Sequence, residues 1–177
     1  NLIKCNPAIK APENKEALWK ALLDDTLDII ATDHAPHTWE EKQQPYAQAP
    51  AGLPLVQHPL LLMLHYAQQG KISIEKVVEK MAHAPAICFQ ISKRGFIREG
   101  YFADLVLVNL NQNYTVSKEN ILYKCGWSPL EGMTLPASIS HTFVNGNIVF
   151  ENGKINEGTN GMRLAFEREY SDLNLRY

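Results

Sequence analysis

The stretch that decides the fold is Ile29-Ile30-Ala31-Thr32-Asp33-His34-Ala35-Pro36-His37, an apolar run that ends in Asp and His side chains. Such a run is typical of a buried strand in an α/β barrel, which delivers polar groups to a catalytic mouth. Asp33 lies where the strand stops being hydrophobic. Pro36 then keeps the chain from continuing as helix or ladder before His37. We therefore expect part of an active site at Asp33 and His37.

A second strand with a polar end precedes this one. Residues 2–5 are a short strand candidate that ends at Asn6-Pro7, because proline cannot extend a ladder. Residues 13–25 have apolar side chains at helical spacing, and residues 27–31 are the buried strand. The order strand, helix, strand predicts a βαβ unit, whose parallel strands end on the same side of the sheet. Asn6 is therefore expected beside Asp33.

The remaining chain falls into a helical part and a β-rich part. Residues 38–56 form a long proline-containing loop, followed by expected helices at 59–69, 73–81 and 85–89. After residue 92, short strands alternate with turns, and Asn145-Gly146 is a strong signal for a type I′ hairpin. We therefore expect one unit at residues 1–92 and a second, antiparallel unit with a tail at residues 93–177.

Composition excludes several classes of protein. The chain has 177 residues, 45% hydrophobic and 20% charged, and a formal net charge of -2. This weak charge argues against nucleic acid or an anionic membrane as the partner. No apolar run approaches the length of a bilayer span. Three widely spaced cysteines predict neither a disulfide framework nor a Cys-x-x-Cys zinc site, which favours a reducing, cytoplasmic compartment.

Each candidate site residue also has a plainer interpretation. Asp33 is either a loop former or a carboxylate that binds a divalent metal and accepts a proton. Asn6 is either a turn former or an amide that contacts a substrate carboxylate, and His37 is either a surface histidine or a partner for that carboxylate. Ala51 and Gly52 form either a simple bend or a backbone pressed close to a ligand.

Five segments together resemble the dihydroorotases of the amidohydrolase superfamily. Residues 4–10 are similar to the family segment Lys-x-Asn-Pro-Pro-Leu-Arg, although Ala8 and Lys10 replace its second Pro and its Arg. Residues 31–37 match Ala-Thr-Asp-His-Ala-Pro-His, and residues 50–52 fall where the family has a Pro-x-Gly substrate loop. Residues 99–107 are similar to the superfamily's Gly-x-x-Ala-Asp-Leu-Val-Leu strand, and residues 128–147 resemble its closing segment.

The resemblance implies both a fold and a reaction. The fold would be α/β: the C-terminal part of a metal-dependent (β/α)8 TIM barrel plus part of a small β-sandwich. The reaction would be the reversible cyclisation of N-carbamoyl-L-aspartate to dihydroorotate. By the family's roles, Asp33 would be a metal ligand and the catalytic base or acid. Asn6 and His37 would bind the small-molecule substrate, and Ala51 and Gly52 would give it main-chain contacts.

The resemblance also implies what this chain lacks. The family holds two zinc ions, and most of its metal ligands lie upstream of the matching segments. Only the last one or two βα units of a barrel of ~250 residues are expected here. The first residue is Asn1, so we expect the start of a longer protein to be missing and this chain to be inactive by itself.

Two alternatives to a dihydroorotase stay open. A related cyclic amidase, an allantoinase or a dihydropyrimidinase, is less favoured because those families usually have Ser-Asp-His at residues 32–34. A non-catalytic dihydroorotase-like subunit that scaffolds a transcarbamoylase would have lost its metal ligands, and the presence of Asp33 and His37 counts against it. The resemblance further predicts a homo-oligomer, with a transcarbamoylase as a second candidate partner.

Overall fold

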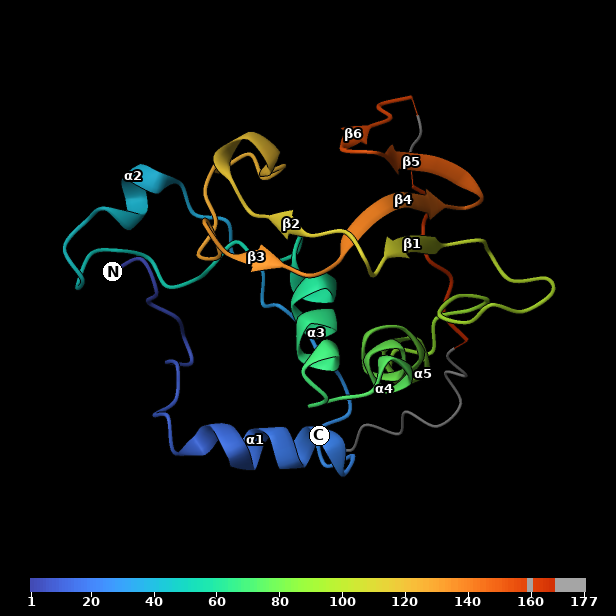
Figure 1. Cartoon of the computed structure of the whole chain (residues 1–177), viewed down its shortest axis with the longest axis horizontal. Coiled ribbons are helices and arrows are strands. Elements are labelled where there is room, and N and C mark those ends of the chain that lie inside the picture. Colours follow the sequence, from blue (N-terminus) through green and yellow to red (C-terminus); the bar gives the residue numbers. More distant parts are fainter. Residues whose placement is uncertain (159–160, 168–177) are drawn as a thin grey trace, which may run out of the picture.

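The computed structural model describes residues 1–158 and 161–167 and shows helices followed by strands (Figure 1). The helical segments are α1 (Asn14–Leu23), α2 (Trp39–Lys42), α3 (Pro59–Gln68), α4 (Ile74–Val78), η1 (Glu79–His83), α5 (Ala84–Cys88) and η2 (Lys118–Asn120). The strands are β1 (Leu105–Asn109), β2 (Tyr114–Thr115), β3 (Thr134–Leu135), β4 (Ser138–Val144), β5 (Asn147–Glu151) and β6 (Lys154–Ile155). The domain boundary at residue 92 stays a prediction. Residues 159–160 and 168–177 of the expected tail lie outside the described residues.

Helix α3 is the centre of the molecule and packs on two sides. Leu61 and Leu64 face a core that includes Val116 and Leu135 beside the β2–β3 ribbon. Met63 faces a second core with α4 and α1. Figure 1 shows α3 between α1 below and the strands above. Full burial of each such leucine is worth roughly 2–3 kcal/mol, so α3 holds the two halves together.

The ends of α3 are those that its sequence predicts. Pro59 is in the first turn, where its missing N–H costs nothing. Gly70 adopts φ 72°, and the amides of Gly70 and Lys71 return to Ala67 O and Tyr66 O at 2.9 and 3.1 Å. This pair of bonds is a Schellman motif, which a glycine permits at low cost.

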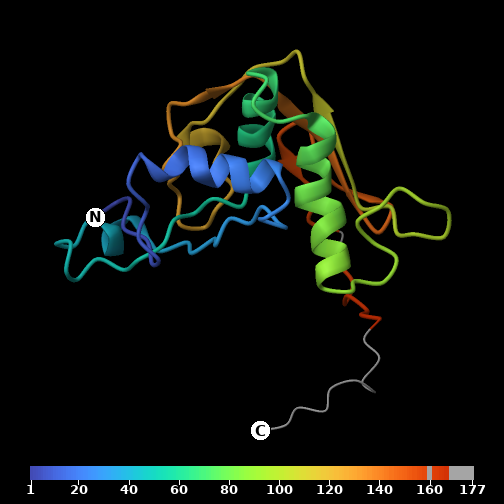
Figure 2. The same cartoon turned by 90° about the horizontal axis from the view of Figure 1, so that it is seen from below.

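Helices α4 and α5 form one continuous rod, whereas we expected two separate helices. Ser73, the first residue of the expected helix at 73–81, caps the rod by accepting a hydrogen bond from the amide of Lys76. The rod passes Pro85 through the π-helical turn η1, in which the Ala84 amide bonds to Glu79 O. The wider turn accommodates a residue that cannot donate an N–H, so proline does not break the helix. Figure 2 shows the rod from the side.

The second half of the chain contains a four-stranded antiparallel sheet in the order β1-β4-β5-β6 and a two-stranded β2–β3 ribbon. The predicted hairpin is confirmed: Asn145 and Gly146 both have positive φ, at 53° and 82°, as a type I′ turn requires. The β-sandwich itself stays a prediction, because a four-stranded sheet and a two-stranded ribbon do not by themselves establish one.

A buried charge cluster fixes the start of β1. Arg94 is 8% exposed and bonds to the Asp104 carboxylate and to Asn145 Oδ1, the latter at 2.6 Å. The second Asp104 oxygen accepts the Asn145 amide at 2.8 Å, and the Arg94 guanidinium lies 4.3 Å from the centre of the Phe102 ring. The Ala-Asp-Leu-Val segment is therefore structural here: its aspartate joins the start of β1 to the hairpin turn.

The two strands predicted at residues 2–5 and 27–31 were wrong, and no parallel βαβ sheet forms from residues 1–33. Neither segment has a strand partner in the described part of the chain, and a ladder exists only between paired strands. Residues 27–31 run extended beside the rod instead. Ile30 donates to Lys80 O at 3.1 Å, and Lys80 Nζ donates to Leu27 O at 2.6 Å.

Candidate functional site

Residues 50–56 lie against residues 33–37, and this contact builds the candidate site. His34 and Leu53 form a parallel β-bridge, and the Ala35 amide donates to Leu53 O at 3.0 Å. The His34 ring closes the contact, because its Nδ1 accepts the amides of Leu55 and Val56 at 3.0 and 3.2 Å. His34 is therefore a structural residue that holds the end of the loop.

Gly52 is required where it stands. Its φ is 138°, and a Cβ placed on it would lie 2.4 Å from Ala35 Cβ and 3.2 Å from His37 Cδ2. Its amide donates to Lys4 O at 2.8 Å. A side chain would push the loop away from both neighbours, so only glycine lets residues 4, 35 and 52 meet.

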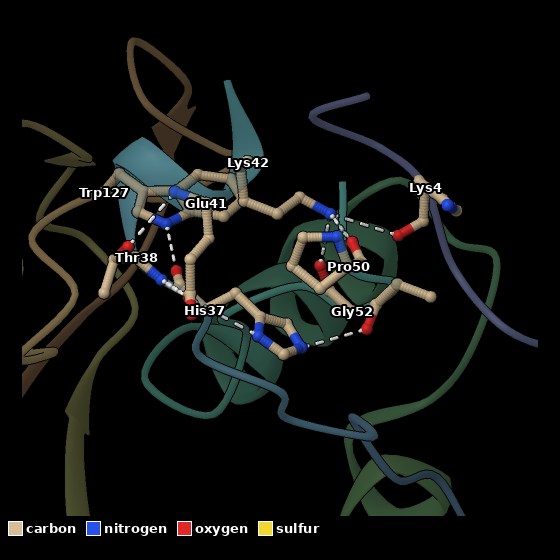
Figure 3. Close-up of polar contacts among 9 residues, drawn as sticks. Lys4, His37, Thr38, Glu41, Lys42, Pro50, Gly52 and Trp127 are labelled. Carbon is tan, nitrogen blue, oxygen red and sulfur yellow. Dashed lines mark hydrogen bonds and ion pairs between the residues drawn. The ribbon is translucent and has the colours of Figure 1, made fainter. Parts of the chain in front are cut away.

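His37 is held on three sides. Its Nε2 donates to Ala51 O at 3.1 Å, and its Nδ1 lies 3.6 Å from a Glu41 carboxylate oxygen. Trp127 donates its indole N–H to the main-chain oxygen of His37 at 2.8 Å (Figure 3). These contacts orient the ring along the loop, and the side chain stays 34% exposed and within reach of a ligand.

The short helix α2 directs a lysine into the site. Thr38 and Glu41 form a reciprocal capping box: the Thr38 hydroxyl accepts the Glu41 amide, and the Glu41 carboxylate accepts the Thr38 amide. The next residue, Lys42, is fully buried, and its Nζ donates to the oxygens of Pro50, Gly52 and Lys4 at 2.9, 2.9 and 3.3 Å (Figure 3). Burial lowers the pKa of this ammonium below its ordinary value, and the nearby Lys4 adds to that effect.

A neutral histidine, His58, and a neutral tyrosine, Tyr123, lie where the loop at residues 50–56 ends. Tyr123 Oη accepts the Gln57 amide at 2.9 Å and lies 3.3 Å from His58 Nδ1. Burial lowers the pKa of the fully buried His58 and raises the pKa of Tyr123 to about 12. Both groups are therefore uncharged near neutral pH.

The structure brings some of the predicted site residues together and leaves others apart. His37, Ala51 and Gly52 meet directly, and Asn6 lies two residues after Lys4, which bonds to Gly52. Asp33 adopts a left-handed φ of 46° at the end of its segment. Asp33 and Asn6 are both exposed and make no hydrogen bond to another described residue, so their side chains are open to a ligand.

The described residues alone do not fit a complete metal site. No group of three or more His, Cys, Asp and Glu side chains is close enough to hold an ion in residues 1–158 and 161–167. His34 Nδ1 already accepts two amides, and His37 Nε2 faces a carbonyl. Asp33 can offer one carboxylate.

No helix in the described part of the chain is long and apolar enough to cross a membrane.

Two residues at the site were missed from the sequence. Lys42 follows a Thr-x-x-Glu capping signature that could have located α2, but nothing in the sequence marks its side chain as buried. Trp127 was not among the predicted site residues, and its bond to His37 joins residues that are 90 positions apart in the sequence. Both stabilise the loop that the predicted residues form.

A model of the amidohydrolase family matches residues 5–149, which is most of the chain. The chain belongs to the amidohydrolase family. This amidohydrolase is 34% identical over 164 residues to a protein named dihydroorotase from Pyrococcus furiosus, covering 93% of the chain and 38% of that protein. It is 37% identical over 149 residues to another named dihydroorotase, from Endomicrobium trichonymphae, covering 84% and 35%. The expected resemblance to dihydroorotases is confirmed.

Two solved structures of hydantoinases have a fold similar to that of this chain. The L-hydantoinase (dihydropyrimidinase) from Arthrobacter aurescens superposes with a TM-score of 0.80 at 28% identity, over 88% of this chain and 36% of that one. The D-hydantoinase (dihydropyrimidinase) from Thermus sp. gives a TM-score of 0.79 at 24% identity, over 87% and 35%, and shows the fold alone. The amidohydrolase chain thus spans a little over a third of the length of the curated relatives it matches.

Proposed function

We propose that this amidohydrolase is the C-terminal part of a zinc-dependent dihydroorotase, with a TIM barrel and a small β-sandwich. The enzyme would interconvert dihydroorotate and N-carbamoyl-L-aspartate in pyrimidine biosynthesis. The observation that most supports the proposal is the meeting of residues 4–6, 33–37 and 50–52, bonded through Gly52 to Lys4 and through His37 to Ala51. The relatives named dihydroorotase agree with it.

Each residue has a role that its geometry allows. The exposed Asp33 carboxylate takes a proton from the attacking water and returns it to the ring nitrogen as the C–N bond breaks. The Asn6 amide donates to the substrate carboxylate, and the outer face of His37 contacts the ring. Among the described residues the Ala51 amide has no acceptor, while its carbonyl is held by His37, so this N–H is available to a substrate oxygen.

Zinc binding and assembly are part of the same proposal. Amidohydrolases are generally metal-dependent, and Asp33 would supply one ligand of a site for two zinc ions whose other ligands lie outside the described residues. Residues 1–177 on their own would then be inactive. We also propose a cytoplasmic homo-oligomer, with a transcarbamoylase as a further partner.

A hydantoinase-type cyclic amidase is the second candidate. The superposition on the Arthrobacter L-hydantoinase favours it, because that structure shares most of this chain's backbone. Ring size and the substrate carboxylate distinguish the two reactions, and Asn6 and His37 suit the carboxylated ring of dihydroorotate. A non-catalytic scaffold is the third candidate, and it predicts a protein without bound metal.

The test is a substrate panel and a matched pair of variants in the full-length protein. Dihydroorotate should be the best substrate among dihydroorotate, hydantoin, dihydrouracil and allantoin, and zinc should copurify. Asp33→Asn should abolish turnover, whereas Asp28→Asn, which alters another exposed aspartate, should not. Wild-type turnover in Asp33→Asn, or hydantoin as the best substrate, would overturn the assignment.

A further inference from the structure

Lys42 is a buried lysine that has no carboxylate partner within residues 1–158 and 161–167. Its side chain is fully buried, and its ammonium donates to no Asp or Glu side chain among the described residues. A buried ammonium is costly unless hydrogen bonds replace its hydration. Here three main-chain oxygens, those of Lys4, Pro50 and Gly52, provide those bonds. Such an arrangement gathers backbone from separate segments around one cation.

The segments that Lys42 binds, around residue 4 and at residues 50–52, are those of the proposed substrate site. Pro50 O belongs to the peptide group that carries the Ala51 amide, and Gly52 O belongs to the peptide group after Gly52, so Lys42 holds the loop before and after Ala51. Lys4 lies two residues before Asn6, and its own ammonium donates to Tyr46 O and Ala49 O at 2.7 Å each. The two lysines therefore hold the loop at residues 46–52 at both ends, Lys4 at residues 46 and 49 and Lys42 at residues 50 and 52. Figure 3 shows the bonds of Lys42.

Lys42 is not part of the hydrophobic packing that stabilises the fold. It belongs to neither hydrophobic core, and it stands on a four-residue helix fixed by its own capping box. Removing its three bonds should therefore loosen the loop and leave the cores around α3 in place. A role in folding alone would affect both.

We propose that Lys42 is a positioning residue that sets the backbone of the substrate loop, so that the Ala51 amide faces the ligand. This inference rests on the proposed function and names the residue that shapes its site. Since the loop binds substrate and does no chemistry, losing Lys42 should raise KM more than it lowers kcat. Misplacement of a binding group by a fraction of an ångström is enough to produce such a loss.

The experiment replaces Lys42 in the full-length protein. Lys42→Met keeps an apolar stem and removes all three donors, and it should raise KM for dihydroorotate about ten-fold with kcat changed less than about three-fold. Lys42→Cys alkylated with 2-bromoethylamine restores an ammonium at nearly the same reach and should recover most of the affinity. Wild-type protein treated with the same reagent controls for Cys5, Cys88 and Cys125. Lys124→Met, at an exposed lysine, should behave as wild type.

Hydrogen exchange gives a second readout that does not need activity. In Lys42→Met the amide of Gly52, which donates to Lys4 O, should exchange about ten-fold faster, while those of Leu61 to Leu64 in α3 stay protected. Unchanged KM and unchanged exchange would overturn the inference, as would equal loss of protection in α3, which would mean a general folding role. If wild-type protein does not turn over dihydroorotate but the exchange result appears, the proposed function fails and the role of Lys42 stands.

Discussion

Trp127 donates its indole N–H to the main-chain oxygen of His37, 2.8 Å away and 90 residues earlier in the chain. Trp127 is 3% exposed, and its ring meets the edge of Trp39 with centroids 6.1 Å apart. A residue of the β-rich half of the chain thus binds His37 in the candidate site. The position of His37 depends on the packing of both halves.

Trp127→Phe should weaken substrate binding. The variant keeps an aromatic ring but leaves His37 O without its donor, which costs about 1–2 kcal/mol of stability together with the lost volume. Because His37 then moves more freely, KM in the full-length enzyme should rise about five-fold. Steady-state kinetics and thermal melting check this. Trp39→Phe is the matched control: it keeps an aromatic ring beside Trp127, and Trp39 is 45% exposed and makes no bond to His37, so KM should change much less than in Trp127→Phe.

Gly52→Ala should disrupt the loop. The new Cβ would collide with Ala35 Cβ at 2.4 Å, and the φ of 138° is strained for alanine, so about 3 kcal/mol of stability should be lost. Substrate affinity should fall with it. Gly70→Ala separates strain from collision, since Gly70 also has positive φ but open space around its Cα. It should cost about 1 kcal/mol and leave KM unchanged. Equal effects of the two variants would contradict the contact with Ala35.

His58 should make the fold less stable in acid. Burial lowers its pKa in the folded state, so the unfolded chain binds a proton first as pH falls. Its contribution is therefore complete above the ordinary histidine pKa of about 6.5 and is lost as pH falls toward the folded-state pKa, by at most about 2 kcal/mol at pH 5. Urea unfolding at several pH values should show a shallower acid loss for His58→Gln than for wild type. Parallel pH curves would contradict this.

Asp104→Ala should destabilise the junction of β1 and the hairpin. It leaves the buried Arg94 guanidinium without its carboxylate and frees the Asn145 amide, at a cost of about 3 kcal/mol. Urea unfolding measures this directly. The double variant Arg94→Met, Asp104→Leu removes both charges and should recover much of the loss. A double variant less stable than Asp104→Ala would contradict the account.

Local signals in the sequence predicted the local structure well. Asn145-Gly146 predicts its turn because both residues tolerate positive φ, and Pro59 and Gly70 mark the ends of α3 because proline and glycine act within one turn. Strands were predicted less well. Residues 2–5 and 27–31 have the composition of strands, but a strand needs a partner, and composition does not say which partner is present.

Site residues that belong to a sequence motif could be predicted, whereas site residues whose role depends on tertiary contacts could not. The family segments pointed to His37, Ala51 and Gly52, which the structure brings together. Lys42 looks like one more surface charge after two glutamates. Its burial follows from carbonyls supplied by residues 4, 50 and 52, and a property shared by three distant segments cannot be read from any one of them.

The π-helical turn before Pro85 amounts to one additional residue wound into an otherwise α-helical rod. Each residue of an α-helix turns the chain by about 100°, so this single insertion sets the direction in which all of α5 faces. Ala86 is thereby placed against Gly95, so close that a Cβ on Gly95 would lie 2.4 Å from its methyl group. Deleting one residue from the turn would regularise the helix and rotate Ala86 away from this contact. The contact between α5 and the segment that leads into the β-rich half thus depends on the number of residues in the turn η1 as much as on their side chains.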